Sequence, residues 1–263
     1  MATTKIDFTQ IKTGLPAGGD VNYNDVTLLL NMEGSDGSNS FSDGSSSGHV
    51  ITAGGSVAIS TSQYKFGASS AYFNGTDSSL QIARDEASFN IAPAEDYTYE
   101  AWYYSAVQPA GYHVILNNFR DDQGYIGWSL LTHGNKFHFN LQGNYTDTAS
   151  TWAANTWYHL AVVRSAGVAT LYINGTADSN TVSYNGAVSS ITGSGPWVGG
   201  SPEYAGGAGA RWLTGYVDGV RVTKGLARYT SNFSVPTAAF PAFESKEGKR
   251  LVVNANESIE LES

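Results

Sequence analysis

The sequence predicts an all-β protein, a sandwich of two antiparallel sheets with an extended arm at each end. Short apolar segments alternate along the chain with turns rich in Gly, Ser and Asn, and 30 of the 263 residues are Gly. Hydrophobic residues make up 41% of the chain and aromatic residues 13%, whereas charged residues make up only 14%. That composition is typical of a globular sandwich whose polar surface comes from Ser, Thr, Asn and Gly. Cysteine is absent, so the fold rests on burial and hydrogen bonds.

The first 25 residues predict an arm or linker. A short alternation, KIDFTQI, is followed by LPAGGD, whose Pro and Gly residues mark a break. Such an arm either packs on its own domain, pairs with a neighbouring subunit or is mobile. The apolar run at 27–32 then predicts a buried strand, and the Gly-, Ser- and acid-rich stretch after it predicts a loop.

The next segments read as strands. SSAYFNG (69–75) and SLQIA (79–83) flank the sequence NGTD, which predicts a tight hairpin. YTYEAWYYS (97–105) carries bulky side chains on both faces, so we expect a strand in the middle of a sheet. Segments 113–119, 125–132 and 137–143 predict an antiparallel meander, with the Phe137, Phe139 and Leu141 face in the core.

A hairpin is predicted from WYHLAVVRSAGVATLYING, with a turn at Asn174-Gly175. His159 in its first strand could act as a catalytic base, but strand histidines are more often packed and hydrogen-bonded, and we expect this role. The Gly-rich region 186–212 predicts surface loops carrying Trp197 and Tyr204. There they would offer flat rings to a sugar or partner, unless Trp197 and Val198 form one more strand.

The clearest strand pattern lies within GYVDGVRVTKGLARYTSNFSVPTAAF (215–240). Strict alternation places Asp218 on the apolar face with Tyr216, Val220 and Val222. A carboxylate on a core face is costly unless it is satisfied. We therefore expect either backbone amides of a loop or a structural cation to reach Asp218.

Several of these motifs together resemble a known family. TWYHLAVVRS (156–165), ATLYINGT (169–176) and the closing strand with its Gly-x-x-Asp pattern resemble the laminin G-like domain, a concanavalin A-like jelly roll. The run RVTKGLARYTSNFSVPTAAFP is similar to the version found in virion proteins of tailed bacteriophages. The resemblance implies a jelly-roll domain over 26–243, between the arm at 1–25 and a strand-like tail at 244–263.

The resemblance also implies a structural calcium site. In this family an acidic loop helps to hold Ca²⁺ against the Asp of the closing strand, and Asp43 and Asp218 match these positions. Carbonyls around Ser45 to Gly48 would complete the hard oxygen shell that calcium prefers. The chain departs from the family pattern by placing Gly44 directly after Asp43.

The predicted function is non-enzymatic. The glucanases of this superfamily need paired carboxylates on a strand, but no Glu-x-Asp occurs, and Glu100 has Trp102 and Tyr104 at the partner positions. The first hypothesis is a structural or adhesive virion protein, such as a capsid decoration, head-fibre or tail-accessory subunit. The alternatives are a carbohydrate-binding lectin and, with less support, a glycoside hydrolase. Candidate residues for binding a glycan or partner are Tyr103, Tyr104, Trp197 and Tyr204.

Charge and hydropathy indicate which classes of partner to expect and where the protein is located. A net charge of -9 repels phosphate backbones, so nucleic acid is not an expected partner. The sequence contains no apolar run long enough for a membrane span and no signal peptide at its N-terminus. We therefore expect synthesis in a host cytoplasm and a final place in the virion.

The tail, with NANES as a turn, predicts a small hairpin. Strand-like ends favour contacts with virion proteins or a symmetric homo-oligomer such as a trimer.

Overall fold

The computed structural model describes residues 19–120, 126–189, 195–200, 211–242, 251–253 and 259–261. The chain divides into two compact units, one of them Asp25–Phe240 and the other formed by Met1–Asn24 together with Pro241–Ser263. The first unit contains the two large sheets. In the second, β16 (Leu251–Val253) pairs antiparallel with β17 (Ile259–Leu261), so the hairpin predicted in the tail is confirmed.

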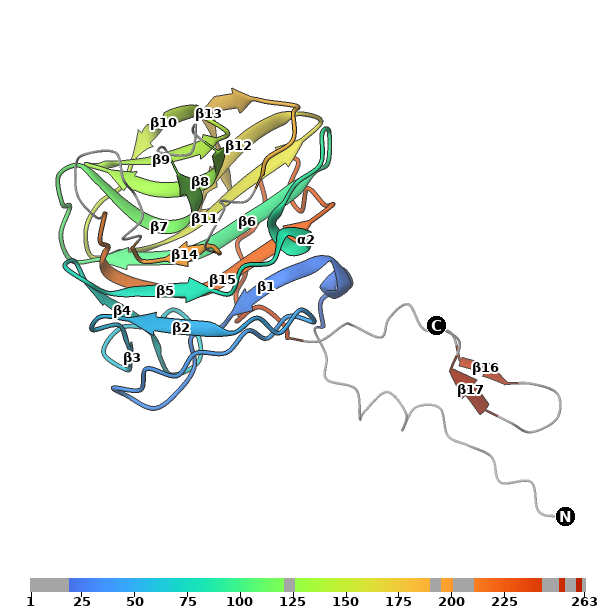
Figure 1. The fold of residues 1–263 in the computed structure, drawn as a ribbon, viewed down its shortest axis with the longest axis horizontal. Coiled ribbons are helices and arrows are strands. Elements are labelled where there is room, and N and C mark those ends of the chain that lie inside the picture. The colour runs from blue at the N-terminus through green and yellow to red at the C-terminus, as the bar shows by residue number, and fades with distance from the viewer. Residues whose placement is uncertain are drawn as a thin grey trace, which may run out of the picture. The chain divides into compact units, whose positions relative to one another are not determined.

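Two antiparallel sheets stack face to face in the first unit (Figure 1), which confirms the predicted jelly-roll sandwich. The eight-stranded sheet has the order β13-β12-β11-β6-β15-β4-β3, with β1 also paired to β15. Its strands are β1 (Val26–Leu30), β3 (Ala58–Ser60), β4 (Ser70–Asn74), β6 (Tyr97–Ser105), β11 (Thr156–Ser165), β12 (Val168–Ile173), β13 (Thr176–Ser183) and β15 (Thr214–Lys224).

The second sheet has the order β10-β9-β8-β7-β14-β5-β2. Its strands are β2 (Ile51–Gly54), β5 (Ser79–Ile82), β7 (Tyr112–Arg120), β8 (Ile126–His133), β9 (Lys136–Leu141), β10 (Asn144–Thr151) and β14 (Trp197–Val198). The described residues also form two short helical turns, η1 (Tyr23–Asp25) and α2 (Glu86–Phe89). Among the described residues, no helix is long and apolar enough to cross a membrane.

Aromatic and aliphatic side chains from the facing sides of both sheets form the core. Tyr99 on β6 stacks on Trp128 of β8 with ring centroids 4.5 Å apart. Phe137, Phe139 and Leu141 are fully buried, as predicted. The strand β6 lies between β11 and β15, which confirms its expected place in the middle of a sheet.

The turn at NGTD does not close a hairpin, contrary to the sequence prediction. The strands on either side of it belong to different sheets, because β4 pairs with β15 and β3 whereas β5 pairs with β14 and β2. The side chain of Asn74 accepts hydrogen bonds from the amides of Thr76 and Asp77, which tightens the turn locally. An Asn-Gly signal fixes the backbone of a turn, but it does not determine which strands pair across it.

A β-bulge in β15 overturns the face assigned to Asp218. The register with β6 shifts between Asp218 and Arg221, and Gly219 in the bulge has a φ of 55°. Val217 and Val220 therefore both point into the core, while Asp218 lies on the outer face with Tyr216. A bulge inserts one extra residue, so the strict alternation used in the prediction fails at this point.

Candidate functional site

The outer face of the eight-stranded sheet has a covered half. Residues 225–240, which we call the closing segment, follow β15 and pack over β11 and β12. Tyr229 and Phe233 stack with ring centroids 3.6 Å apart and pack against Tyr172. The amide of Phe233 donates to the carbonyl of Gly175, and Phe240 is only 4% exposed.

A buried ionic cluster lies under the closing segment. The carboxylate of Glu100 on β6 accepts hydrogen bonds from Arg221 Nε at 2.8 Å, His159 Nε2 at 3.0 Å and the Tyr229 hydroxyl at 2.9 Å. Glu100 and His159 are both 0% exposed. Burial alone would raise the pKa of Glu100, but Arg221 and His159 outweigh it and hold the pKa at about 2. The prediction that His159 is packed and hydrogen-bonded is confirmed.

Asp218 lies at the border of the covered half. Its Oδ2 atom accepts hydrogen bonds from the amides of Lys65 at 2.8 Å and Phe66 at 3.0 Å. The loop amides, one of the two predicted ways to satisfy this carboxylate, are therefore present in the structure. Burial raises the pKa of Asp218 to about 6 despite these bonds, and the charge of Glu33 adds to the rise.

The other half of the same face is open and aromatic. Four side chains stand in one register row across four neighbouring strands: Trp157 on β11, Tyr104 on β6, Tyr216 on β15 and Tyr72 on β4. We call these four residues the aromatic row. Centroid distances between successive rings are 5.5, 6.0 and 5.1 Å. Tyr72 is 38% exposed and the other three are half-buried.

Polar groups border the aromatic row. The hydroxyl of Tyr104 donates to Asn155 Oδ1 at 3.2 Å, and Tyr216 forms a hydrogen bond with Ser60. Beyond the row, the Lys65 ammonium lies 4.2 Å from the ring centroid of Trp102, the next outward residue of β6. A floor of aromatic rings with hydrogen-bonding groups at its rim can stack against the C–H faces of a ligand and also bind its hydroxyls.

The structure separates the predicted binding residues. Tyr104 belongs to the aromatic row, but Tyr103 is 0% exposed and packs against Phe137 and Trp152 in the core, so its assignment to a surface site is wrong. Adjacent residues of a strand face opposite sides, and only one of this pair can be outside. Trp197 is 7% exposed on β14, so the alternative reading of this residue as part of a strand is confirmed, and its surface-loop role is wrong. Tyr204 lies outside the described residues.

Three members of the aromatic row were missed in the sequence. Trp157, Tyr216 and Tyr72 are separated by many residues along the chain and meet Tyr104 only through strand register. Each lies in a predicted strand, but the prediction placed Tyr216 on the apolar face, and only the bulge in β15 shows that it faces outward. Which strands are neighbours is a tertiary property that no local pattern contains.

The Asp43 carboxylate is engaged with its own surroundings. Oδ1 accepts from the amides of Leu29 and Ser45, and Oδ2 accepts from the Ser45 hydroxyl and the amide of His49, each at 2.9 Å. Asp218 likewise accepts from amides. Donors aimed at both carboxylates do not make an open oxygen shell for Ca²⁺, so these contacts give the calcium prediction no support, and it stays a prediction.

Comparisons with known proteins identify the fold family. A search of curated proteins finds no match. Solved structures with a similar fold include the crystal structure of HCR/D-Sa-GBL1/C, with a TM-score of 0.55 and 15% identity over 78% of this chain and 49% of that one. The binding domain of Paraclostridial Mosquitocidal Protein 1 has a TM-score of 0.52 and 16% identity, over 77% and 48% of the two chains.

A third structure, the binding domain of Botulinum Neurotoxin DC in complex with SialylT, has a TM-score of 0.50 and 14% identity over 76% and 48% of the chains. The chain thus spans about half the length of these solved structures. The profile of the family described as the Concanavalin A-like lectin/glucanases superfamily matches residues 74–227, which is more than half of the chain. The chain therefore belongs to the Concanavalin A-like lectin/glucanases superfamily.

Proposed function

We propose that this chain is a non-enzymatic carbohydrate-binding module that serves as a structural or adhesive subunit of a tailed-phage virion. The aromatic row carries the proposal. Four rings on neighbouring strands leave apolar surface in water on a rigid sheet, and flat rings of this kind stack against sugars. Rings supported by strands lose little conformational freedom when a ligand binds.

The rim supports a ligand rich in hydroxyl groups. Asn155 is exposed, and its side chain already holds the Tyr104 hydroxyl, so both groups are oriented before a ligand arrives. Oriented donors and acceptors next to an apolar floor are the usual composition of a small-ligand site. A relative with this fold, a binding domain in complex with SialylT, adds support for a binding role.

The state of Glu100 supports a function without hydrolysis. A retaining glycosidase needs one carboxylate as nucleophile and a second carboxyl group as acid and base, both open to the substrate. Glu100 is fully buried, paired with Arg221 and His159, and its pKa of about 2 keeps it ionised. It therefore cannot deliver a proton to a leaving group at neutral pH.

The test is binding of the purified full chain to an array of host-surface glycans, followed by titration of each positive glycan. We expect Tyr72→Ala and Trp157→Ala each to weaken binding about tenfold, which corresponds to about 1.4 kcal/mol. Tyr145→Ala is the matched control, because Tyr145 is 64% exposed but lies on β10 of the other sheet. Tyr204→Ala tests, in the same assay, the binding role predicted for the Gly-rich loops of 186–212.

No binding to any host-surface glycan, or equal affinity in the row variants and the control, would overturn the carbohydrate-binding proposal. Hydrolysis of a bound glycan that is lost in Glu100→Gln, while the variant remains folded and still binds that glycan, would instead favour the glycosidase alternative.

The virion part of the proposal rests on the phage-like run from Arg221 to Pro241 and on β16 and β17, which form a strand pair outside the unit Asp25–Phe240. Short strand pairs with free edges can add to a partner's sheet or to a second copy of the chain. Light scattering of the full chain and of a chain without residues 1–25 and 244–263 tests this. We expect an oligomer, such as a trimer, that becomes a monomer on trimming, and a monomer in both forms would contradict assembly through these segments.

A further inference from the structure

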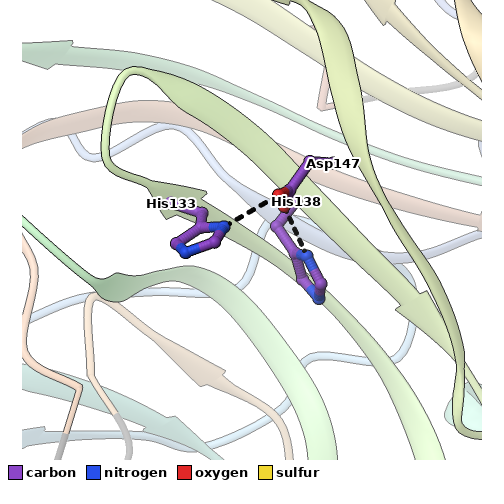
Figure 2. Close-up of side chains that lie close together, drawn as sticks. All are labelled: His133, His138 and Asp147. Carbon is purple, nitrogen blue, oxygen red and sulfur yellow. Dashed lines mark hydrogen bonds and ion pairs between the residues drawn. The ribbon is translucent and has the colours of Figure 1, made fainter.

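Two histidines and an aspartate meet on the outer face of the seven-stranded sheet. His133 ends β8, His138 lies on β9 and Asp147 on β10, and Asp147 is the register partner of His138. Figure 2 shows the carboxylate of Asp147 between the two imidazole rings. His133 Nδ1 lies 2.9 Å from Asp147 Oδ2, and His138 Nδ1 lies 2.9 Å from Asp147 Oδ1.

The three side chains offer a metal-binding set. One ligand atom from each residue lies within 4.8 Å of the others. Two imidazole nitrogens and a carboxylate oxygen are the ligands of many zinc sites, in which a water completes the tetrahedron. Imidazole favours zinc and similar transition metals, whereas calcium and magnesium prefer oxygen ligands alone.

One of the three side chains is buried, and the other two are open to solvent. The His138 side chain is 8% exposed, whereas those of His133 and Asp147 are 36% and 34% exposed. An ion can therefore reach the carboxylate from solvent.

Neighbouring aromatic rings hold the ligands in place. Tyr112 stacks on His133 with centroids 3.9 Å apart, and Tyr145 packs beside His138 at 5.4 Å. The Asn180 side chain donates to the backbone carbonyl of Asp147 at 2.9 Å, which fixes the β10 backbone at this position. Support of this kind around the ligands raises metal affinity because less freedom is lost on binding.

We propose that His133, His138 and Asp147 bind a divalent transition-metal ion of the zinc class, through the two Nδ1 atoms and a carboxylate oxygen, with water completing the shell. Each imidazole then carries its proton on Nε2 instead of Nδ1. The site is independent of the proposed glycan site, because the aromatic row lies on the other sheet.

The experiment is calorimetric titration of the full chain with Zn²⁺, with Ca²⁺ and Mg²⁺ as comparison ions, and with Co²⁺ followed by visible absorption. We expect one Zn²⁺ per chain and an at least tenfold loss of affinity in His133→Gln and Asp147→Asn. His113→Gln is the matched control, since His113 on the adjacent strand β7 has both ring nitrogens bonded to backbone carbonyls.

Affinity in His133→Gln equal to that in the control would overturn the proposal and leave two histidines that only hold Asp147 by hydrogen bonds. The cobalt spectrum is recorded on the unmodified chain, so this second test does not depend on whether a variant folds. Absence of the visible bands of four-coordinate Co²⁺ at saturating ion would overturn the proposal as well.

Discussion

Two halves of one sheet face differ although the same strands build them. On β6, Glu100 lies in the covered half and Tyr104 in the open half, only four residues further along. The covered half places a fully buried carboxylate and histidine and a buried arginine beneath the closing segment. In the open half the outward positions are aromatic and partly exposed. The comparison teaches that an outward strand position can be core or surface, depending on a segment that arrives later in the chain.

Removing the charge of Glu100 should have the largest effect. Glu100→Gln removes the negative charge from the buried Arg221–Glu100 pair, and breaking a buried pair in this way costs about 3–5 kcal/mol of unfolding free energy. Urea denaturation at neutral pH measures the loss. A loss below about 1 kcal/mol would mean that the covered half is not held together by this cluster.

The border residue Asp218 should give a smaller, pH-dependent effect. Its folded pKa of about 6 lies above its ordinary value of 3.8, so its ionisation opposes folding. This contribution favours the fold fully below pH 3.8 and is lost as the pH rises through 6, a difference of about 3 kcal/mol. Between pH 4.5 and 6, the unfolding free energy of Asp218→Asn should therefore change less with pH than that of the unmodified protein. This window lies above the ordinary Glu100 pKa of 4.5, so that it is separate from the titration of Glu100.

Unfolding free energies of the two proteins at half-unit pH steps measure the difference. A constant difference across that window would show that Asp218 does not titrate there.

The calcium prediction concerns the same residue and implies a more modest change. Bound Ca²⁺ stabilises the fold by mass action. EDTA should therefore lower the melting temperature by about 2–4 °C for each kcal/mol that Ca²⁺ binding adds to the free energy of unfolding. Asp218→Asn should remove the difference between chelated and calcium-loaded protein. Identical melting curves of the unmodified chain with and without EDTA would rule the ion out.

The smallest effect on stability is expected in the open half. Tyr72→Ala removes a ring that is 38% exposed and stacks tilted on Tyr216 at 5.1 Å. Because this ring is not in the core, we expect a loss of less than about 1 kcal/mol in urea denaturation. A loss as large as that of Glu100→Gln would show that the aromatic row is structural and would remove the basis for its binding role.

The corrections show where local patterns reach their limit. Alternation correctly placed Phe137 and Leu141 in the core, because each strand there is regular and its two faces meet different environments. It failed at Asp218, where the bulge at Gly219 shifts the register. The choice of both Tyr103 and Tyr104 as site residues did not apply alternation, which places adjacent strand residues on opposite faces.

The sequence by itself determined the fold class, the positions of most strands and the packed role of His159, because period-two burial and turn residues are local properties. The family could be inferred as well, because its motifs are short and contiguous. The tertiary structure alone decided which strands are neighbours, and this brought Trp157, Tyr104, Tyr216 and Tyr72 into one row. It alone decided that His133, His138 and Asp147 converge. Strand neighbours are chosen by how the whole chain buries its apolar faces, and that balance of free energy is not contained in any single segment.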